Sequence, residues 1–200
     1  MNIKTLIGIY DSNTYIIDAP KGIIIIDCGT EFEHIEKVLQ KCQKPVSLLL
    51  THGHIDHIYS AAKLQQHGAT VFIHDGDAER LYTDKHEGGR RGYVVEFCKP
   101  DKSYDEGEVL NLAGLSIKVL HTPGHTEGSV CFIVEDKIFT GDTLFFEDYG
   151  RTDLYGGDHS KIKKSLFRLF DLDQKLTVYS GHYRTSTIGH EKKCNPINNN

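Results

Sequence analysis

Apolar residues occur along most of the chain in short runs separated by turn-forming residues, a pattern that favours β-strands. Residues 14–30, TYIIDAPKGIIIIDCGT, hold two such runs around Pro20 and Gly22, which predicts two short strands joined by a turn. Further runs predict strands at 47–50, 69–74, 129–136, 137–142 and 175–182, and a hairpin at 109–120. The chain is therefore expected to be rich in strands.

Three segments instead carry apolar residues with helical spacing, and they lie between the predicted strands in both halves of the chain. They cover residues 31–43, 57–68 and 160–172, and Gly68 is expected to close the second of them. Strands outnumber helices in this pattern. We therefore predict an α/β (α+β) protein in which two sheets pack face to face and helices cover the outer faces.

Two segments fit neither pattern. Residues 83–100 combine paired glycines with charges and are interpreted as a mobile loop, whose role is open. Residues from about 191 to 200 end in NPINNN and are interpreted as a polar, frayed tail. Because no repeat and no Pro- or Ser-rich linker divides the chain, we expect one domain over residues 1–200.

Composition narrows the possible partners. The 200 residues carry a formal charge of −5, which argues against a broad surface for nucleic acid or for an anionic membrane. No apolar run approaches the roughly 20 residues of a transmembrane helix, and the first residues lack the apolar core of a signal peptide. The five cysteines show no CxxC spacing, so we expect reduced thiols and a cytoplasmic protein. The oligomeric state is open.

The most informative segment is residues 47–60, SLLLTHGHIDHIYS. A buried strand is followed directly by His52, His54, Asp56 and His57. His52 and His54 are two positions apart and project to one side of an extended segment, whereas Asp56 and His57 fall at the start of the next helix. This concentration of imidazole and carboxylate groups favours a metal site. Isolated histidines, including His190, are instead interpreted as surface or hydrogen-bonded residues.

Three more potential ligands follow strand ends elsewhere in the chain. His125 comes after a strand and a Pro-Gly turn, Asp142 after IFTG, and His182 after VYSG. Glycine at such points lets the backbone bend and approach an ion closely. We therefore expect four strand ends to bring all seven side chains together.

Seven donors exceed the three protein ligands and one water of a single catalytic zinc. They divide into three, three and one shared, with a carboxylate bridging two ions. Since imidazole and carboxylate suit zinc, iron or manganese, we predict two divalent metal ions, with zinc as the first choice. Two such ions would hold a bridging hydroxide and polarise a carbonyl or phosphoryl oxygen.

The segments THGHIDH, HTPGHTEGS, FTGDTLF and SGH resemble, in order and spacing, the metal motifs of the metallo-β-lactamase superfamily. This resemblance spans about residues 10–190 and implies a four-layer αββα sandwich. It assigns the first metal to His52, His54 and His125, and the second to Asp56, His57 and His182. Asp142 would bridge the two ions.

Within that superfamily, GDTLFFEDYGRTDLYGGD resembles the short bacterial members of the glyoxalase II branch, the hydroxyacylglutathione thioesterases. The resemblance implies a metallo-hydrolase in which the metal-bridging hydroxide attacks a small thioester. Asp56 would also orient the nucleophile, and Arg151 and Tyr183 are candidates for contacting substrate. The chain departs from glyoxalase II because only eighteen residues follow His182 and because GHYRTS replaces Gly-His-Gly-Pro.

Other functions stay open. Persulfide dioxygenases also resemble this sequence and would use a single iron bound by His52, His125 and Asp142. A lactonase would use the same hydroxide. A binding protein stabilised by metal is disfavoured because structural zinc sites close their coordination with four ligands.

Overall fold

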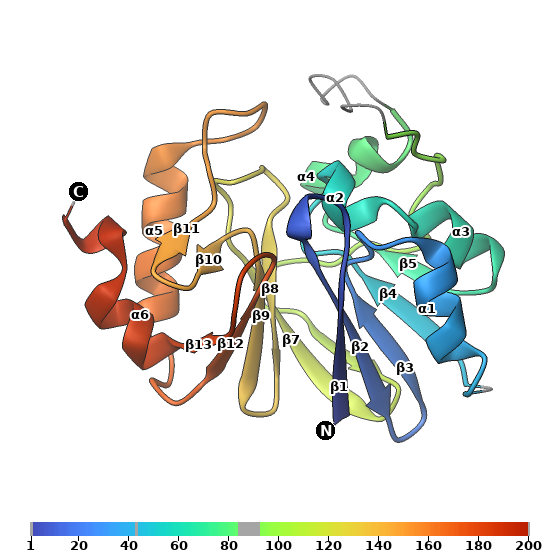
Figure 1. Ribbon diagram of the computed structural model, residues 1–200. Helices are drawn as coiled ribbons and strands as arrows, with labels where there is room; N and C mark the ends of the chain where they lie inside the picture. The colour runs from blue at the N-terminus through green and yellow to red at the C-terminus, as the bar shows by residue number, and fades with distance from the viewer. Residues whose placement is uncertain (1, 43, 84–92, 200) are drawn as a thin grey trace.

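The computed structural model describes residues 2–42, 44–83 and 93–199. Two sheets stand side by side in Figure 1, with helices on the outer face of each sheet. The first sheet has the strand order β1-β2-β3-β4-β5, and the second has the order β13-β12-β9-β8-β7-β6. Both sheets contain antiparallel and parallel pairs.

The first sheet is formed by the N-terminal half of the chain. Its strands are β1 (Asn2–Ile7), β2 (Asn13–Ala19), β3 (Gly22–Ile26), β4 (Val46–Leu49) and β5 (Thr70–Phe72). β1, β2 and β3 pair antiparallel, whereas β3, β4 and β5 run parallel. β1 was not predicted from the sequence, because it lies at the sheet edge with four of its six residues exposed and so lacks a clear apolar run.

The second sheet is formed by the C-terminal half. Its strands are β6 (Val109–Leu112), β7 (Leu115–His121), β8 (Val130–Val134), β9 (Lys137–Gly141), β12 (Thr177–Ser180) and β13 (Ser186–Thr187). β9 and β12 run parallel, and the other pairs are antiparallel. A separate small hairpin joins β10 (Leu144–Phe145) to β11 (Asp148–Tyr149).

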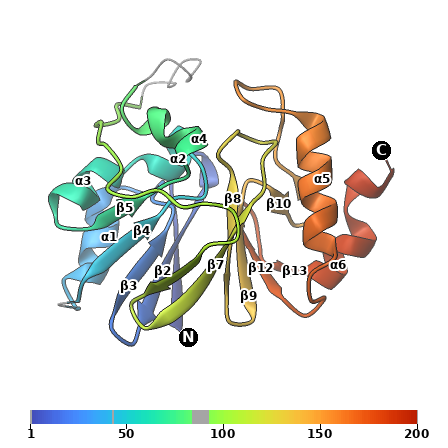
Figure 2. The ribbon, with the colours of Figure 1, turned by 180° about the vertical axis from the view of Figure 1, so that it is seen from behind.

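Helices cover the outer face of each sheet, as Figures 1 and 2 show from opposite sides. α1 (Phe32–Leu39) and α3 (Ala61–Gln66) cover the first sheet, and α5 (His159–Phe170) and α6 (Ile188–Cys194) cover the second. The short helices α2 (Ile55–Ile58) and α4 (Asp75–Ala78) lie near the strand ends. The predicted αββα sandwich is confirmed. None of the described helices is long and apolar enough to span a lipid bilayer.

Successive side chains of a strand point to opposite faces of the sheet, which explains how one strand contributes to two buried layers. In β3, Ile24 and Ile26 pack into the cluster between the two sheets, whereas Ile23 and Ile25 pack toward α1 and α3. All four side chains are at most 2% exposed. Burying each contributes about 1.5–3 kcal/mol, so this uninterrupted isoleucine run stabilises two layers at once.

Three local predictions need correction or fall outside the description. The single helix expected at 57–68 is two helices, because Ser60 donates hydrogen bonds to Thr30 O (2.6 Å) and Cys28 O (3.0 Å) where α2 ends. The tail expected at 191–200 is wrong as far as residue 199, because α6 and a 3-10 helix (Pro196–Asn199) form there and Ile197 is buried. The expected mobile loop lies partly in 84–92, outside the described residues, and 93–100 form no helix or strand.

Candidate metal centre

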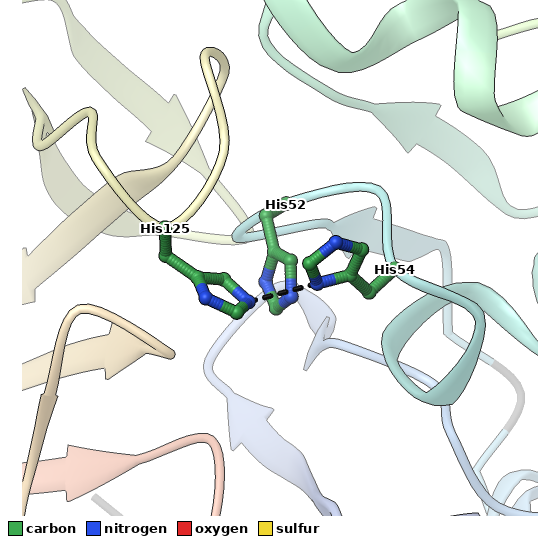
Figure 3. A group of neighbouring side chains, drawn as sticks. All are labelled: His52, His54 and His125. Carbon is green, nitrogen blue, oxygen red and sulfur yellow. Dashed lines mark hydrogen bonds between the residues drawn. The ribbon is translucent and has the colours of Figure 1, made fainter. Parts of the chain in front are cut away.

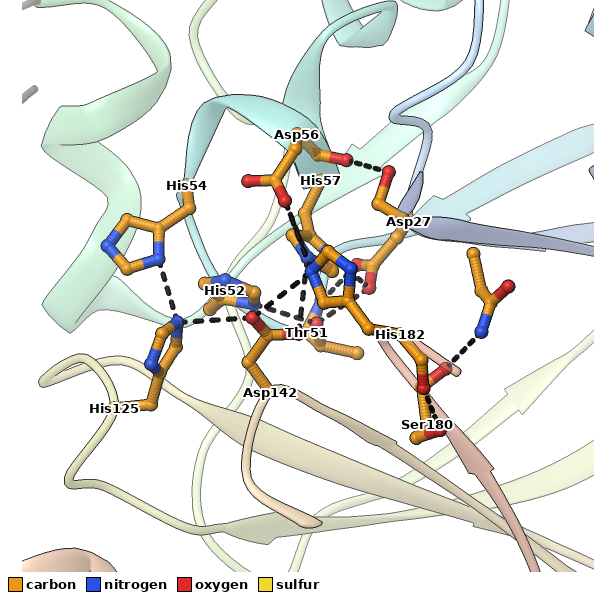
Figure 4. A network of polar contacts seen from close by, with 12 residues as sticks. Asp27, Thr51, His52, His54, Asp56, His57, His125, Asp142, Ser180 and His182 are labelled. Atoms are coloured by element: carbon orange, nitrogen blue, oxygen red, sulfur yellow. Dashed lines mark hydrogen bonds and ion pairs between the residues drawn. The ribbon is translucent and has the colours of Figure 1, made fainter. Parts of the chain in front are cut away.

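Loops from both sheets meet at one edge of the sandwich and bring the seven predicted ligands together (Figure 4). The first sheet contributes the loop after β4 and the helix α2. The second sheet contributes the segments that follow β7, β9 and β12. The convergence therefore joins the two halves of the chain at their strand ends.

Three histidines form one group, drawn in Figure 3. His52 and His54 follow β4, and His125 follows β7; one ring nitrogen from each lies within 4.8 Å of the other two. His54 Nδ1 and His125 Nε2 are 2.8 Å apart. All three residues are buried. Their ring nitrogens converge as three ligands of one ion would.

A second group lies beside the first. Asp56 and His57 come from α2, and His182 follows β12. Asp56 Oδ2 is 3.2 Å from His182 Nε2 and 3.6 Å from His57 Nε2. The side chains of Asp56 and His182 remain 13% and 17% exposed, whereas that of His57 is fully buried. The centre is therefore open to solvent on the side of Asp56 and His182.

Asp142 lies between the two groups (Figure 4). Its carboxylate oxygens are 3.4 Å from His125 Nε2 in the first group, and 3.2 and 3.5 Å from the Nε2 atoms of His57 and His182 in the second. Oδ2 makes the contacts with His125 and His182, and Oδ1 makes the contact with His57, so the carboxylate adjoins both groups. The bridging role that the resemblance assigned to Asp142 stays a prediction.

The centre contains polar atoms that are buried without a hydrogen bond within the described residues. They include His52 Nε2, His57 Nε2 and Asp142 Oδ1, although the last two lie 3.2 Å apart. Buried polar atoms nearly always find a partner, so such a cluster needs an explanation. Divalent metal ions bound at the centre would give these atoms the partners that they lack.

The first group is suited to remain neutral. Burial lowers the pKa of His52, His54 and His125 below the usual value for histidine, and lowers it well below that value for His52 and His54. A neutral imidazole is the form that binds a metal. These three residues therefore present lone pairs without first losing a proton.

The second group sits among carboxylates. Burial opposes the charged form of His57, but the carboxylates of Asp142, Asp56 and Asp27 outweigh it and raise the His57 pKa well above the usual value. Burial is likewise outweighed at His182, where hydrogen bonds to Asp142 and Asp56 raise the pKa to about 9. Such an excess of negative charge favours cations, and metal ions would compete with these protons.

Asp27 positions the second group and was missed by the sequence analysis. It follows β3 with a left-handed backbone conformation (φ 57°) and is 2% exposed. Its carboxylate accepts hydrogen bonds from Thr51 N (2.7 Å) and Thr51 Oγ1 (2.8 Å) and lies 2.8 Å from His57 Nδ1. A partner at Nδ1 leaves Nε2 of His57 directed at the centre.

Asp77 in α4 performs the same task for the first group. It is fully buried and accepts hydrogen bonds from Gly53 N and Thr126 Oγ1, each at 2.7 Å, and from Gly128 N at 2.9 Å. Gly53 separates His52 from His54, and Thr126 follows His125. One carboxylate therefore fixes both loops that carry the first group.

Glycine is required where β12 ends. A Cβ atom on Gly181 would lie 2.1 Å from Asp142 Oδ1 and 2.8 Å from His57 Cε1. The buried Asn13 holds the adjacent segment by donating to Ser180 O and Tyr183 O, both at 3.0 Å. The chain can thus bring His182 beside Asp142 only with glycine at position 181.

The two predicted substrate contacts lie at the rim. Arg151 is largely exposed and makes a two-pronged ion pair with Asp153, with both distances 2.7 Å. Its carbonyl oxygen lies 2.8 Å from His125 Nδ1, so its backbone helps to orient that ligand. Tyr183 is 66% exposed and follows His182 directly. Contact of either side chain with substrate stays a prediction.

Tyr183 borders a pocket of about 570 Å³ beside the centre, lined by Phe146, Glu147, Asp148, Tyr183 and Arg184. The Phe145 ring packs edge-on against both His182 and Tyr183 and so joins this pocket to the proposed metal ligands. The guanidinium of Arg184 lies 3.7 Å above the ring centre of Phe146.

Comparison with known proteins gives a consistent result. The sequence profile of the Metallo-beta-lactamase superfamily matches residues 7–182. The hydroxyacylglutathione hydrolase GloC of Haemophilus influenzae is 35% identical over 209 residues, which cover 100% of this chain and 99% of GloC.

Solved structures agree in fold. BLEG-1, described as a B3 metallo-beta-lactamase, superposes with a TM-score of 0.90 at 30% identity, covering 98% of this chain and 99% of its own. TTHA1623 in a di-iron-bound form superposes with a TM-score of 0.86 at 32% identity, covering 98% of this chain and 100% of its own. ETHE1 from Myxococcus xanthus superposes with a TM-score of 0.78 at 28% identity, covering 98% of this chain and 84% of its own.

Proposed function

The chain belongs to the metallo-beta-lactamase superfamily, whose matched relatives support a metal-dependent hydrolase, and we propose that its substrate is a thioester of the hydroxyacylglutathione type. The observation that carries this proposal is Asp142, which contacts histidines of both groups and so fits a centre of two ions rather than one. The similarity to GloC over the whole chain supports the thioester.

We assign His52, His54 and His125 to one ion, Asp56, His57 and His182 to the other, and Asp142 to both. Bound divalent ions would polarise the thioester carbonyl and lower the pKa of the attacking water. The choice among zinc, iron and manganese is left to measurement, because imidazole and carboxylate ligands suit all three.

The residues of the chain perform the remaining tasks. Asp56 lies on the open side of the centre, next to His182, and is placed to accept a hydrogen bond from the attacking water and orient it. Its backbone oxygen accepts a hydrogen bond from Ser12 Oγ at 2.6 Å, which fixes α2 against the first sheet. A thiolate is a good leaving group, so a strong general acid is not needed.

The substrate thiol portion is proposed to lie in the pocket beside Tyr183. This pocket adjoins His182 on the open side of the centre, and it offers an aromatic surface and the guanidinium of Arg184. Tyr183→Ala should raise KM with little change in kcat, because the lost contact is made equally in the ground state and the transition state. A fall in kcat at unchanged KM would show that the thiol portion lies elsewhere.

The proposed substrate is tested with a panel. It contains S-lactoylglutathione, the same acyl group on a smaller thiol, a lactone, and a β-lactam, the last because of the similarity to BLEG-1. We expect both thioesters to be hydrolysed faster than the other two. Faster turnover of the lactone or the β-lactam would contradict the thioester.

A second candidate is oxidation of glutathione persulfide with one bound iron. The residues that the resemblance assigns to that iron, His52, His125 and Asp142, do lie together: His125 and Asp142 are 3.4 Å apart, and His52 adjoins each of them. This candidate gives no task to Asp56, His57 and His182, so oxygen uptake and metal content distinguish it from the hydrolase.

A further inference from the structure

A second cluster of potential metal ligands lies outside the seven-residue centre. Glu147, in the turn between β10 and β11, faces His190 and Cys194 of α6. One donor atom from each of the three lies within 4.8 Å of the other two, the same limit that the two groups of the main centre meet. His190 Nε2 and Glu147 Oε1 are 2.9 Å apart. We call these three residues the surface trio.

The α6 helix supplies two of the three donors on one face. His190 and Cys194 are four residues apart, so their side chains lie one above the other along the helix. Cys194 is exposed, and His190 is half-buried. A hydrogen bond between His190 and Glu147 alone would explain their approach, but it would not explain why a thiol completes the cluster.

A buried carboxylate holds the trio together. Glu191 is fully buried and accepts hydrogen bonds from Glu147 N (2.9 Å), Asn195 Nδ2 (3.2 Å) and Ser186 Oγ. The backbone of Glu147 is thereby tied to the helix that carries His190 and Cys194. The Phe146 ring also stacks on the His190 ring, with centroids 5.2 Å apart. The donors are therefore brought together by the fold itself.

The chemistry of the donors selects a class of ion. A thiolate with an imidazole and a carboxylate suits zinc and related transition metals rather than magnesium or calcium. Three protein ligands leave one tetrahedral position for water. We propose that the surface trio binds a divalent transition metal ion separately from the two ions of the main centre. The exposure of Glu147 and Cys194 points to an exchangeable ion.

Cobalt distinguishes the two sites. The seven donors of the main centre include no thiolate, so a sulfur-to-cobalt charge-transfer band in the near ultraviolet reports a cysteine ligand alone. We expect this band when the full-length protein, kept anaerobic with its thiols reduced, is titrated with Co²⁺. Cys194→Ser should abolish the band. Cys42→Ser, which alters a half-buried thiol elsewhere, should leave it unchanged.

A variant of His190 tests a second donor. His190→Ala should weaken the cobalt site by at least about tenfold, the loss that removing even an outer partner of a metal ligand causes. Zinc content should fall from three ions per chain to two in Cys194→Ser, with thioester hydrolysis unchanged. No charge-transfer band in the wild type at saturating cobalt, or a band that persists in Cys194→Ser, would overturn the proposal. Neither result depends on which substrate the main centre hydrolyses.

Discussion

The main centre and the surface trio both combine imidazole and carboxylate donors at similar separations, but only the trio has a thiol and the two sites differ in burial. His52, His57 and His125 are at most 3% exposed, whereas Glu147 and Cys194 lie on the surface. Burying polar or charged side chains costs free energy unless a hydrogen-bond partner, an opposite charge or a metal ion compensates for the lost water. The main centre therefore gains more from binding metal than the trio does.

The two sites also differ in the partners behind the ligands. Asp27 fixes His57, Asp77 fixes the loops of the first group, and the carbonyl oxygen of Arg151 contacts His125. In the trio the fixed element is the backbone of Glu147, through Glu191. Donor types and spacing thus identify where an ion can bind, whereas burial and supporting partners determine how tightly it is held and what chemistry it serves.

The largest effect is expected at the residue shared by both groups. Asp142→Ala should remove the contact that joins them, release much of the metal, and reduce thioester hydrolysis by on the order of 10³-fold. The matched control is Asp136→Ala, an exposed carboxylate at the opposite end of β9, which should retain both metal and activity. Metal analysis and initial rates on the two variants make the comparison. Full activity in metal-free protein would contradict metal-dependent hydrolysis.

A smaller loss is expected from His57→Ala, which affects the second group alone. The variant should keep about one ion per chain and lose on the order of 10²-fold in hydrolysis, as when one preorganised electrostatic group is removed. His159→Ala, which alters an exposed histidine of α5, is the control. If His57→Ala retained two ions, the division of ligands between the two groups would be wrong.

Asp27→Asn tests the support behind the ligands. The amide can still accept the hydrogen bond from Thr51 N, but it no longer presents a carboxylate to His57 Nδ1. Loss of such a partner typically lowers metal affinity by about 10–100-fold. In a competition experiment, the variant should therefore lose its metal at a chelator concentration lower than the wild type by about the same factor. Unchanged affinity would mean that burial alone holds His57.

The smallest effect on hydrolysis is expected at the surface trio. Cys194→Ser should leave kcat and KM for the thioester unchanged, because Cys194 is neither a proposed ligand of the main centre nor a residue that lines the pocket beside Tyr183. Steady-state kinetics with and without added Zn²⁺ provide the measurement. A fall in kcat in the variant would show that the two sites are coupled and do not act independently.

The convergence of the seven side chains could be predicted from the sequence because its signal is local. HGHIDH follows a buried strand, and His125, Asp142 and His182 follow strands that end at a turn or a glycine. The sandwich was likewise readable from apolar runs of strand length between amphipathic helices. Each of these features is decided within a few residues, so it needs no knowledge of distant contacts.

The supporting residues were not predictable in this way. Asp27 follows a buried strand and Asp77 lies among other acidic residues, but neither belongs to a ligand motif, and their roles arise only when distant loops fold against them. The C-terminal helix was missed for a related reason. Its buried polar residues, Glu191 and Asn195, look like a solvated tail in composition, but they bond the turn at Glu147 and the β11 strand.

The most direct test of the account measures metal content and reaction on the same wild-type protein. The protein is loaded with zinc, iron or manganese in turn, and each form is assayed for S-lactoylglutathione hydrolysis and for oxygen uptake with glutathione persulfide. We expect two ions per chain in the seven-residue centre, thioester hydrolysis, and negligible oxygen uptake. A single iron in that centre, with oxygen consumed on addition of persulfide and no hydrolysis, would contradict the account and establish the dioxygenase in its place.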